Sequence, residues 1–259
     1  MANQPLHITL FGGGNVATHL AKNLLTLPDV RLQQIYNRHL DAIKAFEQDT
    51  EIIDELSQLK PADMFILALK DDAIVPFSKK LQAFDTLTVH TSGSVAMTDL
   101  QTRRKGVLYP FQTFSKDKPD IDFSNIPILI EAENDTDLLL LKNLGNLLSK
   151  NVQIVDSEQR KALHIAGVFA ANFVNYMYRQ AAELLQDNQL SFDLLKPLIL
   201  ETAQKVQTLS PIEAQTGPAS RGDYKTIRKH LDFLKTGSKY ELYKYLSELI
   251  LKDSERKKI

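Results

Sequence analysis

The 259-residue sequence has no cysteine, which excludes disulfides, thiolate catalysis and cysteine-ligated zinc or iron–sulfur clusters. It has no excess charge either: 31 lysines and arginines balance 32 aspartates and glutamates, which argues against a nucleic-acid partner. No apolar run approaches the ~20 residues that a membrane span requires, and no basic or apolar leader precedes the first predicted strand. We therefore expect a cytoplasmic protein with neither a membrane nor a nucleic-acid partner.

The six histidines include no His-x-x-x-His pair, so a metal site is not expected. The contents of hydrophobic residues, 43%, and of charged residues, 24%, are typical of a globular protein. At this length two domains are favoured over one.

The strongest signal in the sequence lies in residues 5–21. A β-rich run over residues 7–11 leads into Gly12-Gly13-Gly14-Asn15-Val16-Ala17, which has the spacing G-x-G-x-x-A, and an apolar periodic segment follows. In this pattern the first glycine permits a tight turn, the second lets the backbone approach a pyrophosphate, and the third small residue lets the helix pack on the sheet. The N–H groups at the helix start then form an anion site. We predict that residues 12–16 bind a dinucleotide; the alternative is a glycine-rich turn that binds nothing.

The end of the second predicted strand, residues 30–36, indicates which dinucleotide binds. NAD-preferring folds tend to carry an acidic residue there, which accepts hydrogen bonds from the ribose 2′-hydroxyl. Here Asn37 and Arg38 follow the strand, and a guanidinium suits a 2′-phosphate by charge and geometry. We therefore predict that NADP is the cofactor and that both residues contact it. The alternative is a surface arginine that begins a helix predicted over residues 40–46.

Strand-like and helical patterns alternate as far as Asp156. A continuous apolar run over residues 64–69 is typical of a parallel strand buried on both faces. Further strands are predicted over residues 86–90, 126–131 and 151–155, and helices over 73–81 and 135–149. Beyond Ser157 only helices are predicted, over residues 160–186, 191–209, 223–235 and 240–252. The prediction is an α/β protein: a Rossmann-type doubly wound sheet in residues 1–156 and an all-helical domain in residues 157–259.

Ligands of open α/β sheets bind beyond the carboxyl ends of the strands. Leu69 and Lys70 follow one predicted strand, and Thr91 and Ser92 follow another. We predict that these four residues line the nicotinamide half of the cofactor site. His90, at the end of its strand, is equally compatible with a functional and a structural role.

The first predicted helix of the second domain carries a polar stripe. At 100° per residue, His164 and Asn175 lie within about 20° of one another, and Lys161 and Asn172 share that relation on a neighbouring stripe. Histidine titrates near neutrality, so we predict His164 as the proton donor, with Asn172 as a second catalytic residue and Asn175 as a substrate ligand. The structural alternative is a core histidine with asparagines bonded to neighbouring helices.

A loop is predicted over residues 216–223, where Gly217, Pro218 and Gly222 restrict the backbone just before a helix. Arg221 and free backbone N–H groups there could hold an anion such as a substrate carboxylate. The alternative is a rigid connection in which Arg221 binds loop carbonyls.

Together these motifs resemble a bacterial family of NADP oxidoreductases that pairs a Rossmann-like domain with a helical domain of unassigned function. The likeness covers nearly the whole chain and rests on residues 12–17, 37–38, 90–94, 109–114, 164–172 and 216–223. More distantly the chain is similar to pyrroline-5-carboxylate reductase, deazaflavin-dependent NADP reductase and the 6-phosphogluconate and hydroxyisobutyrate dehydrogenase group. The resemblance implies that the helical domain mediates homodimerisation and completes a site between the domains.

One departure limits the transfer of a mechanism. The hydroxyisobutyrate group carries a catalytic lysine and an asparagine four residues later, whereas here Lys161 is followed at that distance by Ile165. We expect an NADP-dependent oxidoreductase that moves a hydride between the cofactor and a small carbonyl or imine substrate in an interdomain cleft. A non-catalytic NADP-binding module that signals redox state and a scaffold with a vestigial site are the alternatives.

Overall fold

The structure, a computed structural model, describes residues 4–115 and 121–256. The chain forms two compact units, Met1–Ala171 and Asn172–Ile259. The division falls inside the long helix predicted from residue 160 onward. The domain boundary predicted at Asp156 from the change in sequence pattern stays a prediction.

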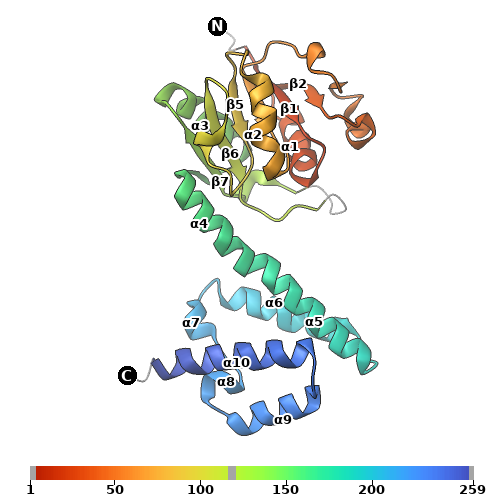
Figure 1. The fold of residues 1–259 in the computed structure, drawn as a ribbon, viewed down its shortest axis with the longest axis vertical. Helices are drawn as coiled ribbons and strands as arrows, with labels where there is room; N and C mark the ends of the chain where they lie inside the picture. The colour runs from red at the N-terminus through yellow and green to blue at the C-terminus, as the bar shows by residue number, and fades with distance from the viewer. Residues whose placement is uncertain (1–3, 116–120, 257–259) are drawn as a thin grey trace. The chain divides into compact units, whose positions relative to one another are not determined.

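The first unit is built around one sheet of eight strands in the order β3-β2-β1-β4-β5-β6-β7-β8 (Figure 1). The strands are β1 Leu6–Phe11, β2 Val30–Tyr36, β3 Glu51–Ile53, β4 Met64–Leu67, β5 Leu87–His90, β6 Lys105–Pro110, β7 Ile128–Ala132 and β8 Val152–Ile154. All neighbouring strands are parallel except β6 and β7. The strand order reverses between β1 and β4, which is the dinucleotide-binding arrangement. The predicted Rossmann-type fold class, with helices C-terminal to it, is confirmed.

Strand β4 shows how the sequence builds a sheet covered on both faces. Met64 and Ile66 join the apolar cluster that contains helices α1 Asn15–Leu25 and α3 Asp135–Leu148. Phe65 and Leu67 join the cluster on the other face, which contains helix α2 Asp71–Ser78. All four side chains are fully buried. A strand with no solvent-facing side has no polar positions, which explains its continuous apolar run.

Three segments of the first unit differ from the prediction. The helix predicted over residues 40–46 is instead two 3-10 turns, Leu40–Ala42 and Lys44–Phe46. Ile43, between the two turns, has φ -124° and ψ 4°, outside the helical range, so the turns do not join into one α-helix. Strands β3 and β6 escape prediction because β3 has three residues, too few for a periodic signal, and β6 is interrupted by a glycine and ends in a proline.

The long helix predicted over residues 160–186 is one helical run whose middle is not an α-helix. Helix α4 Ser157–Gly167 continues into a six-residue π-helix, Val168–Phe173, and then into α5 Val174–Asp187. A π turn closes from i to i+5 and takes in more residues than an α turn. The spacing of 100° per residue, assumed in the predicted stripe from His164 to Asn175, is therefore wrong through this segment.

The second unit is helical. Besides α5 it contains α6 Lys196–Lys205, α7 Pro211–Ala214, α8 Pro218–Arg221, α9 Tyr224–Leu234 and α10 Ser238–Arg256. Helix α10 packs against α8 and α9. The predicted loop over residues 216–223 contains the short helix α8, which Gly222 ends in the left-handed conformation at φ 72°. Within the described parts of the chain, no helix is both long enough and apolar enough to cross a membrane.

Candidate functional site

The turn from β1 into α1 requires glycine at position 12. Gly12 has φ +132°, and a Cβ at this position would lie 2.2 Å from the carbonyl oxygen of Ala68, just beyond β4. Ala17, 2% exposed, lies 3.5 Å from the same point. The small residues of the motif thus let β1, α1 and the end of β4 meet closely.

Gly14 and the first turn of α1 leave space for an anion. A Cβ built on Gly14 would meet no atom within 4 Å, and both Gly14 and Asn15 are exposed. No side chain caps the helix and no acidic residue lies in its first turn. Its backbone N–H groups and its dipole therefore fit a pyrophosphate, in agreement with the spacing of the motif.

The side chain of Asn15 has another task. Asn15, His19 and Asn23, at four-residue spacing on α1, bond the carbonyl oxygens of Phe114, Ser115 and Ile121 at 2.9, 2.8 and 3.2 Å. These bonds hold residues 114, 115 and 121 against α1. Asn15 therefore offers a ligand its backbone, while its amide group is engaged with the protein.

A cavity of about 920 Å³ extends from this turn along the carboxyl ends of the strands, and every residue that lines it belongs to the first unit. All the predicted cofactor ligands line it, namely Gly12, Gly13, Gly14, Asn15, Val16, Asn37, Arg38, Leu69, Lys70, Thr91 and Ser92. Arg38 is exposed beside Asn37, so a positive charge is available where the 2′-phosphate of NADP is predicted. The cavity also reaches His164 and, unpredicted, Tyr109.

His164 and Tyr109 form a pair in this cavity. The hydroxyl of Tyr109, at the end of β6, lies 2.9 Å from His164 Nδ1, and the two rings meet edge to face. A Cβ built on Gly93 would lie 2.6 Å from His164 Cγ and Nδ1, so the imidazole packs directly on that glycine. In the same way, Gly167 gives room to the ring of Phe111. Helix α4 thus approaches the strand ends at two glycines.

Burial, more than the surrounding charges, raises the pKa of the Tyr109 hydroxyl and keeps it protonated. Burial raises the pKa of Tyr109, the negative charge of Asp71 raises it further, and the positive charge of Arg160 opposes them. The phenol therefore keeps its hydrogen throughout the neutral pH range.

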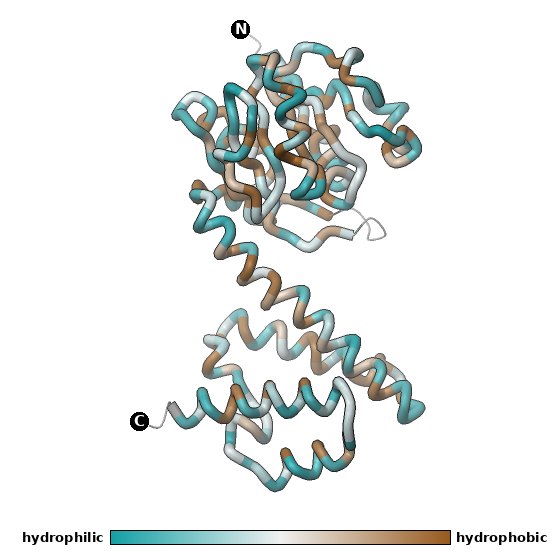
Figure 2. Tube along the Cα trace, viewed as in Figure 1, coloured by the Kyte–Doolittle hydropathy of each residue, from teal (hydrophilic) through white to brown (hydrophobic). Residues whose placement is uncertain are grey.

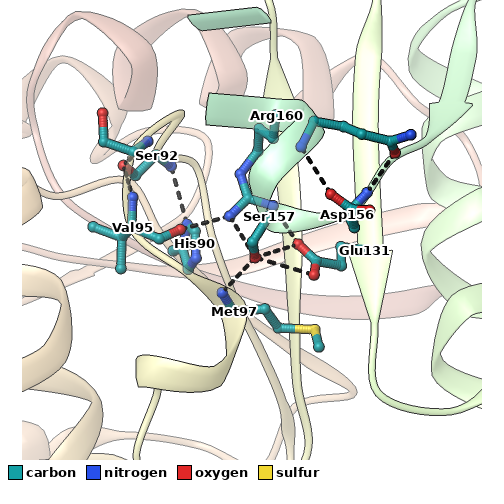
Figure 3. A network of polar contacts seen from close by, with 10 residues as sticks. His90, Ser92, Val95, Met97, Glu131, Asp156, Ser157 and Arg160 are labelled. Atoms are coloured by element: carbon teal, nitrogen blue, oxygen red, sulfur yellow. Dashed lines mark hydrogen bonds and ion pairs between the residues drawn. The ribbon is translucent and has the colours of Figure 1, made fainter. Parts of the chain in front are cut away.

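Arg160 fixes helix α4 to the sheet (Figure 3). Its side chain is fully buried, pairs with Glu131 of β7, and donates to the carbonyl of Val95 at 2.5 Å and to Ser157 Oγ at 3.2 Å. Ser157 Oγ in turn donates to Glu131 at 2.9 Å and accepts the N–H of Met97. Because Arg160 and His164 are one turn apart, this network sets the position of the imidazole.

His90 has a structural role in this arrangement. It is fully buried, its Nδ1 accepts the N–H of Ser92 at 3.1 Å, and it does not line the cavity. Burial, assisted by the charge of Arg160, lowers its pKa to about 3. His90 therefore stays neutral and shapes the turn at Ser92, which favours a structural role over a functional one.

The remaining predicted residues, Asn172, Asn175 and Arg221, lie in the second unit and are exposed. Their catalytic and substrate-binding roles stay predictions. Among the described residues, no three histidine, aspartate or glutamate side chains gather where they could hold a metal ion.

Sequence reasoning missed Tyr109 and Arg160. Tyr109 stands in a strand that was not predicted, and Arg160 reads as an ordinary charge on a helix surface. The capping box of Asp156 and Gln159, which starts α4, is a sequence signal that could have placed Arg160 in the first turn of that helix.

The first unit has a Rossmann-type fold with a glycine-rich turn after β1, and comparisons identify relatives of the chain. A family model described as a domain of unknown function, DUF2520, matches residues 126–250. Among solved structures, the "putative NADP oxidoreductase" of Bacteroides fragilis is 41% identical, with a TM-score of 0.88 over 96% of this chain and 98% of that one. The chain belongs to the same family as that protein.

Two solved structures of lower identity share the fold. The imine reductase from Myxococcus stipitatus in complex with NADP⁺ is 14% identical, with a TM-score of 0.66 over 96% of this chain and 93% of that one. The pyrroline carboxylate reductase from Plasmodium falciparum with NADP bound is 13% identical, with a TM-score of 0.61 over 96% and 97%. None of the curated proteins matches the chain. The resemblance drawn from the motifs, to the oxidoreductase family and more distantly to pyrroline-5-carboxylate reductase, is confirmed.

Proposed function

We propose that the protein is an NADP-dependent oxidoreductase that moves a hydride between NADP(H) and a small carbonyl or imine compound. One observation carries the proposal: a single cavity joins an uncapped helix N-terminus beside Gly14 to the hydrogen-bonded pair of Tyr109 and His164. Anion binding and proton donation, the two tasks that such a reaction leaves to the protein, thus share one site.

Two features of the cavity support cofactor binding, one at each end of the adenosine half of NADP. The first turn of α1 offers N–H groups to the pyrophosphate, and Arg38 offers a guanidinium to the 2′-phosphate. The name of the Bacteroides fragilis relative also points to NADP. Asn37 supports the turn, because its Nδ2 lies 2.6 Å from where a Cβ on Gly13 would be.

Redox chemistry is supported by the residues at the other end of the cavity. When bound, NADPH supplies the hydride. Of this chain's own groups, Ser92 and Thr91 line the nicotinamide half, and His164 supplies a proton to the oxygen or nitrogen of the substrate. The imine reductase and the pyrroline carboxylate reductase share the fold, which is compatible with a C=N substrate.

The test begins with calorimetric titration of the full chain with NADPH, NADP⁺ and NADH. We expect saturable NADPH binding that Arg38→Ala weakens by about 10- to 100-fold, because a charge-assisted hydrogen bond contributes about 1.5–3 kcal/mol. NADH binding should not change. Arg31→Ala is the matched control, since Arg31 is exposed on β2, the strand that precedes Arg38, and does not line the cavity.

A turnover assay then follows NADPH oxidation with keto acids, cyclic imines and deazaflavins. Turnover of any of these supports the oxidoreductase. Saturable NADPH binding with no turnover would instead favour the redox-sensing module, and no binding of any pyridine nucleotide would refute the proposal.

The proposal includes a homodimer formed by the second unit, as the family resemblance implies. Leu194 and Leu198 are one turn apart and 65% and 61% exposed, and Phe233 is 62% exposed. Figure 2 shows hydrophobic residues along the helices of this unit. Apolar faces of this kind suit a second copy of the chain. Light scattering should give a dimer for the wild type and a monomer for Leu194→Lys/Leu198→Lys; a monomeric wild type would contradict it.

A further inference from the structure

The two edges of the His164 ring have different surroundings. Nδ1 lies 2.9 Å from the Tyr109 hydroxyl, and the Cγ–Nδ1 edge packs on the backbone of Gly93. The protein therefore occupies the ring on the Nδ1 side. Nε2 is the nitrogen left to meet a ligand in the cavity that His164 lines.

The partner of Nδ1 decides where the ring carries its hydrogen. Burial and the charge of Asp71 keep the Tyr109 phenol protonated against the opposing charge of Arg160. The protonated phenol lies at hydrogen-bond distance from Nδ1 and can donate its hydrogen to that nitrogen of a neutral imidazole; in this tautomer the ring carries its hydrogen on Nε2. When the ring is protonated, Nδ1–H donates to the Tyr109 oxygen, and Nε2 again carries a hydrogen.

We propose that Tyr109 is a positioning residue that keeps His164 Nε2 a hydrogen-bond donor toward the cavity in both charge states of the ring. The inference rests on the proposed function and deepens it. A donor at this point selects a substrate whose reacting group is an acceptor, a carbonyl oxygen or an unprotonated imine nitrogen, and so favours reduction.

The proton balance of that reduction is simple. The substrate carbon gains a hydride from the reduced nicotinamide dinucleotide, and its oxygen or nitrogen gains the proton from Nε2 of the protonated ring. The C=O or C=N double bond becomes a single bond, the cofactor leaves oxidised, and the half-buried ring takes a new proton from solvent.

Nitrogen-15 NMR of the ligand-free protein tests the inference without turnover. The His164 signals are assigned by their loss in His164→Gln. We expect the neutral ring to show a protonated Nε2 and a hydrogen-bonded, unprotonated Nδ1. Tyr109→Phe should shift Nδ1 toward a tautomer mixture and lower kcat by about tenfold, the worth of one hydrogen bond, with the Kd for NADPH unchanged.

Tyr243→Phe is the matched control, because Tyr243 makes the same contact with His230 Nδ1, at 2.7 Å, outside the cavity. It should move the signal of His230 and leave that of His164 and kcat unchanged. A neutral wild-type ring that is protonated on Nδ1 would overturn the inference, even if Tyr109→Phe failed to fold. Failure of the proposed function has a different signature: no calorimetric NADPH binding by a protein whose His164 spectrum is as expected.

Discussion

The imidazole of His164 packs on the backbone of Gly93, where any side chain would have its Cβ 2.6 Å from two ring atoms. Gly93 follows β5 and His164 lies on α4, so this contact sets how closely the helix approaches the strand ends. The left-handed region is not involved at Gly93. Glycine is required at position 93 because a side chain would clash with His164, not because of the backbone conformation.

Gly93→Ala should displace His164 and break its bond to Tyr109. Overpacking of this kind costs about 1–3 kcal/mol, and we expect a lower free energy of unfolding in urea together with a large fall in kcat. Ser94→Ala, at the exposed next residue, is the control and should change neither. Wild-type stability and turnover in Gly93→Ala would show that the helix does not pack as described.

Removing Glu131 and removing Arg160 should lower the free energy of unfolding by different amounts, although both break the same ion pair. Glu131→Leu leaves a fully buried guanidinium without its counter-charge and should cost about 3–5 kcal/mol of unfolding free energy. Arg160→Met should cost less, because the Glu131 side chain is 15% exposed and keeps Ser157 as a donor. The double variant should be more stable than Glu131→Leu alone, and a less stable one would contradict this account.

An exposed ion pair provides the comparison. Lys60 and Glu51 are paired with side chains 58% and 41% exposed. Glu51→Gln should cost below about 1 kcal/mol, since surface pairs contribute little.

His90 should make stability fall in acid. Its folded pKa of about 3 lies below the ordinary value of 6.5, so between these values the unfolded state binds more protons and stability is lost as pH falls. At pH 5 the loss relative to neutral pH is about 2 kcal/mol, from about 1.4 kcal/mol per pH unit. His90→Asn keeps an acceptor for Ser92 and cannot titrate, so urea unfolding at pH 7 and pH 5 should show a smaller difference. An equal difference in both proteins would refute the prediction.

The part of the site that sequence predicts well is the part built from neighbours in the chain. The turn geometry at Gly12, the space above Gly14 and the packing of Ala17 depend on a few consecutive residues, and the motif states their spacing. The central strands can be predicted for the same reason, because a strand buried on both faces has a continuous apolar run in its own sequence.

The pair of Tyr109 and His164 could not be predicted in this way. The two residues are 55 positions apart, and their contact depends on the close approach of Gly93 and on the burial of Arg160 against β7, which local sequence does not report. The π-helix over Val168–Phe173 is likewise invisible to a rule of 100° per residue. Long-range packing, not local propensity, completes this end of the cavity.

Gly14→Ala should separate cofactor binding from folding. A Cβ there meets no protein atom within 4 Å and φ is -81°, so we expect the melting temperature to stay the same or rise slightly. The methyl group would stand where the pyrophosphate approaches the backbone, and we expect the Kd for NADPH to rise at least tenfold in calorimetry. Gly12→Ala is the contrasting variant: its Cβ would lie 2.2 Å from the Ala68 carbonyl at φ +132°, so folding itself should fail. If Gly14→Ala bound NADPH as tightly as the wild type, the dinucleotide could not lie against the first turn of α1.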